Sequence, residues 1–176
     1  GVRLPMDAVG HGVALASAAL SSDGGADAAL AIMTTDTVPK TATASGPGWT
    51  VGGMAKGAGM LAPALATMLV VITTDAVLTA AEADAALRTA TALTFDRTDS
   101  DGCMSTNDTV ILMASGASGA HPDASEFTAA LTGVCGDLAH QLLADAEGSS
   151  HDIAVNVVNA ATEADALDVA RCIARS

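Results

Sequence analysis

Residues Gly52–Asp75 read GGMAKGAGMLAPALATMLVVITTD, and this stretch has two parts of different chemistry. The first part is rich in glycine, which permits backbone conformations and close approaches that larger residues resist, and it contains Lys56. The second part, Leu61–Ile72, is almost wholly apolar and ends in a run of strand-forming residues. A run of this kind predicts a buried strand. The stretch therefore predicts a glycine-rich segment leading into a core strand, with Thr67 where the strand opens.

Thr67 follows Ala66, and this pair has a possible chemistry of its own. A threonine hydroxyl is a weak nucleophile unless a base stands beside it, and one source of that base is its own α-amine, freed when the preceding peptide bond is cut. Such an amine titrates near ~7.7–8.0, so it can accept the hydroxyl proton at working pH. A small residue before the threonine leaves room for the attack. The residues alone leave two interpretations open, a structural threonine and a self-cleaving N-terminal nucleophile.

Three blocks of sequence, in order, resemble one family. They are TTDTVPK at Thr34–Lys40, the run from Trp49 to Asp75, and DGCMSTNDT at Asp101–Thr109. Together they resemble the ornithine acetyltransferase (glutamate N-acetyltransferase) family over nearly the whole chain. The resemblance implies self-cleavage between Ala66 and Thr67, after which Thr67 carries the acetyl group.

The resemblance also implies a reaction and a set of contacts. N-acetylornithine would give its acetyl group to Thr67, and glutamate would then take it, as part of arginine biosynthesis. Thr34, Lys56 and Glu147 would bind the substrate together with Thr67. No cofactor would be needed, although acetyl-CoA is a possible alternative donor, and the full-length protein would form an α2β2 heterotetramer.

The resemblance further implies an internal fragment. Residues 1–66 would be the end of the α chain and residues 67–176 the start of the β chain, together one incomplete catalytic domain. Oxyanion-hole residues and further substrate contacts would lie outside this chain. Two other functions stay open, a self-processing N-terminal nucleophile hydrolase or aminopeptidase, and an inactive unprocessed piece that only completes an assembly.

Lysine is scarce in this chain, since Lys40 and Lys56 are its only lysines and both lie in the matching blocks. The presence of these two lysines in a chain that otherwise has none indicates that their ammonium groups are needed. For Lys40, a solvated loop position is an equal alternative. The dinucleotide-like pattern beginning at Gly57 is interrupted by Pro63 and lacks the long helix that dinucleotide binding requires. The four histidines are far apart without ligand spacing, so we expect no metal.

Composition limits the partners. The formal net charge of −13 disfavours nucleic acid and anionic membrane surfaces. The longest apolar run, Gly57–Ile72, is too short for a membrane helix. The odd number of cysteines, without CxxC spacing, indicates reduced thiols. We therefore expect a cytoplasmic protein without nucleic-acid or membrane partners.

Periodicity predicts an α/β fold, a layered α+β sandwich whose sheets are covered by helices. Besides the central strand, strands are expected at Thr109–Ala114 and His151–Val158, and Thr41–Gly48 is expected to be a surface turn. Thr79 and Glu82 form a capping box that predicts a helix start. The other expected helices are those along Met6–Leu20, Ala26–Met33 and Phe127–Leu142, and one beginning at Thr162.

Overall fold

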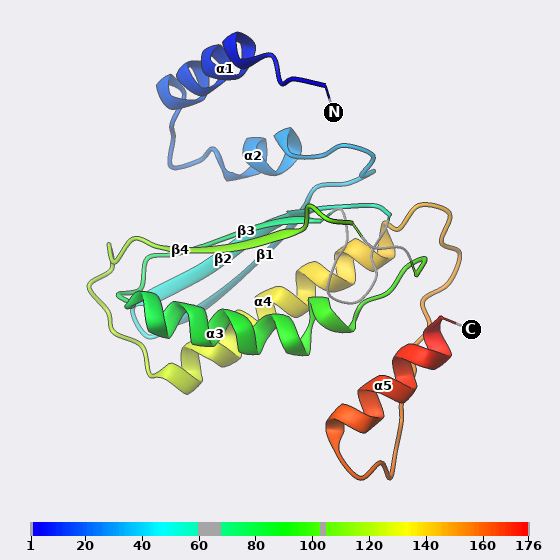
Figure 1. Ribbon diagram of the computed structural model, residues 1–176. Helices are drawn as coiled ribbons and strands as arrows, with labels where there is room; N and C mark the ends of the chain where they lie inside the picture. The colour runs from blue at the N-terminus through cyan, green and yellow to red at the C-terminus, as the bar shows by residue number, and fades with distance from the viewer. Residues whose placement is uncertain (1, 60–67, 103–104, 176) are drawn as a thin grey trace.

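The computed structural model describes residues 2–59, 68–102 and 105–175, and its centre is a four-stranded sheet (Figure 1). The strands lie in chain order: β1 (Lys40–Gly46), β2 (Trp49–Lys56), β3 (Leu69–Thr74) and β4 (Thr109–Ala114). β1, β2 and β3 pair antiparallel, and β4 pairs parallel to β3. The parallel pair requires a crossover, and α3 (Ala80–Leu93) lies within that connection. The chain has an α/β fold.

One face of the sheet is covered by α3 and by α4 (Ala124–Ala144), which lie side by side across it (Figure 1). The core forms between this face and the two helices because every second strand residue points toward them. Trp49 packs on Phe127 with ring centroids 5.3 Å apart, and both are buried. The remaining core is aliphatic, with Val51, Val70, Ile72, Leu131, Val134 and Leu138 at most 1% exposed.

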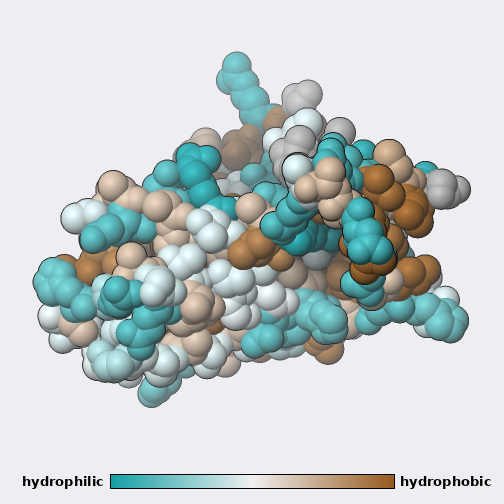
Figure 2. All heavy atoms as spheres, turned by 90° about the horizontal axis from the view of Figure 1, so that it is seen from below, coloured by the Kyte–Doolittle hydropathy of each residue, from teal (hydrophilic) through white to brown (hydrophobic). Residues whose placement is uncertain are grey.

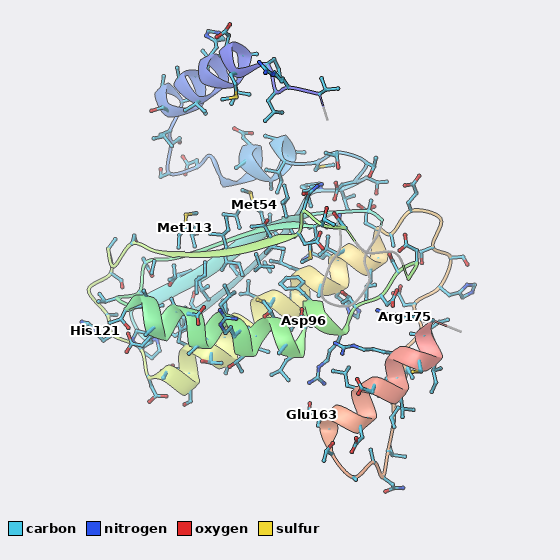
Figure 3. The ribbon with its side chains drawn as sticks, viewed as in Figure 1. Met54, Asp96, Met113, His121, Glu163 and Arg175 are labelled. Atoms are coloured by element: carbon cyan, nitrogen blue, oxygen red, sulfur yellow. The ribbon has the colours of Figure 1, made fainter. Side chains whose placement is uncertain are left out.

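The opposite face of the sheet is more open. Met54 and Met113 point away from α3 and α4 in Figure 3, and Met113 is 51% exposed. The helices on this side are α1 (Met6–Ala18) and α2 (Gly25–Ala31), and α1 buries none of its residues. The apolar stripe therefore predicted the helix α1 correctly, but the residues of this stripe do not enter the core.

The last helix, α5 (Glu163–Ala174), is attached mainly through polar contacts to the segment around η1 (Phe95–Arg97). Arg97 pairs with Glu163 at 2.6 Å, and Arg175 pairs with Asp99 at 3.4 Å. Arg171 donates to the carbonyl oxygen of Asp96 at 3.0 Å. In Figure 2 the surface on the side of α3 and α4 mixes hydrophilic residues with residues of intermediate hydropathy. The more hydrophobic residues gather on the side where α5 lies.

Several expected elements are confirmed. Strand β4 occupies the expected residues Thr109–Ala114. Thr79 caps α3 in a capping box with Glu82, and α4 contains the whole expected Phe127–Leu142 stripe. Thr162 caps α5 by accepting the N–H of Asp165. The described part of the central apolar run forms β3; the residues before Met68 lie outside the described ranges.

Two expectations are wrong. Thr41–Gly48 is not a surface turn, because Lys40–Gly46 forms β1 and pairs with β2 along its whole length. After the buried Lys40, its inward side chains are those of Ala42 and Ala44, so the hydrophobic alternation is weak. A Cβ added at Gly46 would lie only 2.2 Å from an atom of the Trp49 ring, so Gly46 packs directly against that ring. His151–Val158 is not a strand, and Ile153 is 86% exposed. Alternation alone does not make a strand when no neighbouring strand accepts its hydrogen bonds.

Across residues 2–59, 68–102 and 105–175, none of the helices combines the length and the apolar character needed to cross a bilayer.

Candidate functional site

A buried ionic cluster lies beside the N-terminal end of β1. The ammonium of Lys40 donates to Asp36 at 2.7 Å and to Asp145 at 2.5 Å, and the three side chains are 0%, 0% and 6% exposed. Asp145 follows α4 directly, so the cluster joins the segment before β1 to the C-terminal end of that helix. Thr37 adds a hydroxyl and a backbone N–H to the Asp145 carboxylate. Lys40 is therefore a buried counter-ion and not a solvated loop residue.

The pKa values of the two carboxylates reflect this arrangement. Burial alone would raise the pKa of Asp145, but hydrogen bonds from Lys40 and Thr37, with the Lys40 charge, hold that pKa at about 2. Burial also acts to raise the pKa of Asp36, and the N–H of Gly57, the Lys40 ammonium and the N–H of Thr34 outweigh it, so the net shift is downward. Both carboxylates are thus ionised at neutral pH and fully engaged as acceptors.

Asp36 connects this cluster to the glycine-rich segment. Its Oδ1 accepts the N–H of Gly57 at 2.6 Å, and its Oδ2 accepts the N–H of Thr34 at 3.1 Å. Gly57 has φ 151°, a conformation that side-chain-bearing residues rarely adopt. The chain therefore leaves β2 directly after Lys56 in a direction that only glycine permits easily, and Asp36 fixes that departure.

Glu147 reaches the same segment from the loop after α4. Its backbone N–H donates to the carbonyl oxygen of Ala58 at 2.5 Å. A Cβ added at Gly59 would lie 4.0 Å from the Glu147 Oε2, so the carboxylate is close to that glycine. Glu147 is exposed, which leaves its charge available to a ligand.

Asp108 and Lys56 lie where β2, β3 and β4 begin or end. Asp108 Oδ1 accepts the N–H of Met68 at 2.9 Å, while its Oδ2 is buried and has no hydrogen-bond partner in the described part of the protein. Burial raises the pKa of Asp108, with the Met68 N–H and the Lys56 charge acting in the opposite direction. Lys56 is 6% exposed, and among the described residues its ammonium makes no hydrogen bond or ion pair. A cation and an incompletely paired anion thus lie near residue 68.

The expected site residues can now be placed. Thr34, Lys56 and Glu147 lie around the segment Gly57–Gly59. Lys56 directly precedes this segment, and the Glu147 N–H donates to the carbonyl oxygen of Ala58. The Thr34 N–H donates to Asp36, which also accepts the N–H of Gly57. The side chains of Thr34, Lys56 and Glu147 do not bond to one another directly among the described contacts. Ala66 and Thr67 lie outside the described residues, so their roles stay predictions.

Other candidate sites carry less chemistry. Within the described ranges, no three His, Cys, Asp or Glu side chains gather closely enough to hold a metal ion. An open depression of about 480 Å³ lies along α4, lined by Gly136, Asp137, His140, Gln141 and Ala144, and it contains none of the expected site residues.

Sequence reasoning missed Asp36 and Asp145 as members of this region, and it placed Asp108 near the site only through the resemblance of the block Asp101–Thr109 to the family. Asp36 and Asp108 do stand inside the blocks TTDTVPK and DGCMSTNDT, and a carboxylate at those positions was the available signal. Asp145 has no such signal, because it lies 105 residues after Lys40 and meets it only when the chain is folded.

Comparison with known proteins gives consistent matches. The family model described as "ArgJ family" matches residues 1–176. The chain is 64% identical over 176 residues to the "Arginine biosynthesis bifunctional protein ArgJ" of Streptomyces avermitilis, and 62% identical to the proteins of the same name from Streptomyces coelicolor and Thermobifida fusca. Each match covers all of this chain and 46% of the relative. The chain therefore spans about half the length of the curated relatives that it matches.

Proposed function

Because the chain belongs to the ArgJ family, we propose that it forms part of a glutamate N-acetyltransferase of arginine biosynthesis. The complete enzyme moves an acetyl group from N-acetylornithine to glutamate through an acetyl ester on Thr67. Splitting one acyl transfer into two steps through a covalent intermediate lowers each barrier and gives ping-pong kinetics.

The observation that carries this proposal is the convergence of charged groups on the ends of β2 and β3. Lys56 is the last residue of β2, and the N–H of Glu147, in the loop after α4, donates to the carbonyl oxygen of Ala58. Asp108 accepts the N–H of Met68, the residue after Thr67 in the sequence. An amino-acid substrate carries both an ammonium and a carboxylate, so it suits a site whose lysine and glutamate have no ion-pair partner among the described residues. Lys56 pairs with the substrate carboxylate and Glu147 with its amino group, while Thr34 adds a polar contact.

The nucleophile arises by self-cleavage of the Ala66–Thr67 bond, which divides the protein into an α chain that includes residues 1–66 and a β chain that starts at Thr67. Two copies of each chain form an α2β2 heterotetramer in the cytoplasm. The transfer needs no cofactor, and acetyl-CoA is an alternative donor.

Intact-mass measurement of the complete protein tests the proposal. Wild type should give a chain beginning at Thr67 without added protease, and Thr67→Ser should also be cut because it keeps a hydroxyl. Thr67→Ala should remain one chain and transfer no acetyl group. Cleavage or acetylation at this bond in the alanine variant would rule out the mechanism.

A second assay separates the transferase from a hydrolase. Incubation with N-acetylornithine should yield N-acetylglutamate only when glutamate is supplied. Equal release of free acetate with and without glutamate would instead identify a self-processing hydrolase.

A further inference from the structure

Gly57 is the first residue after β2, at the point where the chain leaves the sheet. Strand β2 pairs with β1 as far as Ala55 and with β3 as far as Lys56. The N–H of Gly57 is then accepted by the Oδ1 of Asp36 at 2.6 Å. A side chain thus takes the place of a strand partner directly after Lys56.

The Asp36 carboxylate is held by three donors. Its Oδ1 also binds the Lys40 ammonium at 2.7 Å, and its Oδ2 accepts the N–H of Thr34 at 3.1 Å. The side chains of Asp36 and Lys40 are both 0% exposed, so water does not compete for these bonds. Because all three partners donate, a carboxylate satisfies them, whereas an amide would turn an NH2 group toward at least one donor.

These bonds join two residues that the proposed function assigns to the substrate. Thr34 is bound to Asp36 through its own N–H, and Lys56 is bound through the N–H of the next residue, Gly57. The side chain of Lys56 extends from a backbone that the β2–β3 ladder fixes on one side and Asp36 fixes on the other. One buried carboxylate therefore sets the relative positions of both residues.

The charge of Asp36 does not occupy Lys56. The Lys40 ammonium binds the carboxylate directly, and no ion pair joins Asp36 to Lys56 among the described residues. Opposite charges attract most strongly at contact, so the negative charge of Asp36 acts mainly on Lys40. The Lys56 ammonium stays available for a substrate carboxylate while Asp36 holds the chain beside it.

Building on the proposed function, we infer that Asp36 is a positioning residue for substrate binding, which holds Lys56 through the N–H of Gly57 and holds Thr34 through its own N–H. Lys40 neutralises the carboxylate that makes these bonds. Loss of the Asp36 carboxylate should therefore weaken recognition of the substrate carboxylate more than it slows the chemical step.

The test compares two acetyl donors with the complete, processed protein. N-acetylornithine has the carboxylate that the proposed function assigns to Lys56, and N-acetylputrescine has hydrogen in its place. Wild type should prefer N-acetylornithine in kcat/KM for transfer to glutamate. Asp36→Asn should reduce this preference about tenfold or more, with KM for N-acetylornithine rising more than kcat falls.

A double-variant cycle tests whether Asp36 acts through Lys56. Lys56→Met removes the ammonium that Asp36 is inferred to position. Adding Asp36→Asn to Lys56→Met should lower kcat/KM for N-acetylornithine by about threefold at most, against about tenfold or more when Lys56 is present. Equal losses in the two backgrounds would show a general structural role and overturn the inference.

Asp123→Asn is the matched control. Asp123 also accepts backbone N–H groups, those of Ser125 and Glu126, but it does so at the N-terminal end of α4, whereas Asp145 follows the other end of that helix. This variant should leave KM and the donor preference unchanged. A reduced preference in Asp123→Asn would make the effect a common result of losing such bonds, and so overturn the inference.

The inference and the proposed function fail in different ways. A wild type that transfers no acetyl group to glutamate refutes the proposed function. An active Asp36→Asn protein with wild-type KM and donor preference overturns the inference alone, and a folded but uncut one assigns Asp36 to maturation and also overturns it.

A second variant covers the case in which Asp36→Asn does not fold. Asp36→Glu keeps the charge for Lys40, but its extra methylene displaces the carboxylate by about 1.5 Å, so the bonds to Gly57 and Thr34 cannot both be kept. This variant should fold and still lose donor preference. A folded Asp36→Glu protein with the wild-type preference would overturn the inference.

Discussion

Replacing Lys40 with methionine removes the ammonium that two buried carboxylates share. Lys40 and Asp36 are 0% exposed and Asp145 is 6% exposed, so water cannot take the place of the lysine without rearrangement. Breaking a buried ion pair from one side costs about 3–5 kcal/mol. Asp36 keeps the N–H of Gly57, and Asp145 keeps its contacts with Thr37. We therefore expect Lys40→Met to lower the free energy of unfolding by about 3 kcal/mol, the lower end of that range.

Urea unfolding at pH 7, followed by circular dichroism, measures this loss. The matched control is Arg88→Met, which removes an ion pair whose side chains are 78% and 60% exposed and should leave the free energy of unfolding nearly unchanged. A loss below about 1 kcal/mol for Lys40→Met would refute the reasoning, because a penalty that small is typical of an exposed pair.

The same cluster sets a pH dependence. The pKa of Asp145 is about 2 in the folded protein against an ordinary 3.8, so ionised Asp145 stabilises the fold above pH 3.8. This contribution is lost as the pH falls from 3.8 toward 2. In Lys40→Met the carboxylates lose their cation and protonate at higher pH. Protonation removes the unpaired buried charges that destabilise this variant. The difference between wild type and variant should therefore shrink in acid, and a difference that stays constant from pH 7 to pH 3 would contradict the assignment.

Four further outcomes are expected. Leu138→Ala, at a site 0% exposed, should cost about 2–5 kcal/mol in urea unfolding; a loss under about 1 kcal/mol would mean the core readily collapses around it. Thr79→Ala removes the capping box of α3 and should cost about 1 kcal/mol, whereas Thr89→Ala in the same helix should cost less. Glu147→Gln should raise KM for an amine-bearing substrate and leave cleavage at Thr67 intact; a variant that is not cut would place Glu147 in maturation. Lys56→Met keeps the apolar stem and should lower kcat/KM about tenfold or more without a matching loss of stability, and unchanged kinetics would remove Lys56 from the site.

The sequence predicted those elements whose signals are local. The Thr79–Glu82 box and the apolar stripe of α4 each involve residues within a few turns of one helix, and both were confirmed. Strand β1 was missed because Ala42 and Ala44 contrast weakly with Thr41 and Thr43, with which they alternate. His151–Val158 shows the opposite error, a strong alternation for which the described strands supply no partner.

The site was predictable only in part for the same reason. The resemblance singled out Thr34, Lys56 and Glu147, and the fold brings their segments together around Gly57–Gly59. Periodicity contains no information about which carboxylate will meet Lys40 or Met68, because those contacts depend on how the sheet and α4 are assembled. The pairing of Asp145 with Lys40 and the bond between Asp108 and Met68 were therefore found only in the structure.

The pairing of β2 with β3 has a consequence for assembly. The two strands form an antiparallel ladder from Val51↔Thr74 to Lys56↔Leu69, and the bond between Ala66 and Thr67 lies in the connection between them. In the proposed processed form, β1 and β2 belong to one polypeptide, and β3, β4, α3 and α4 belong to another, although they share one core. Unfolding then releases two molecules in place of one, so refolding after denaturation becomes second order and slows on dilution. Under the proposed cleavage we therefore expect the single chain to fold before it is cut, and the two chains to stay together only while their dissociation is slow.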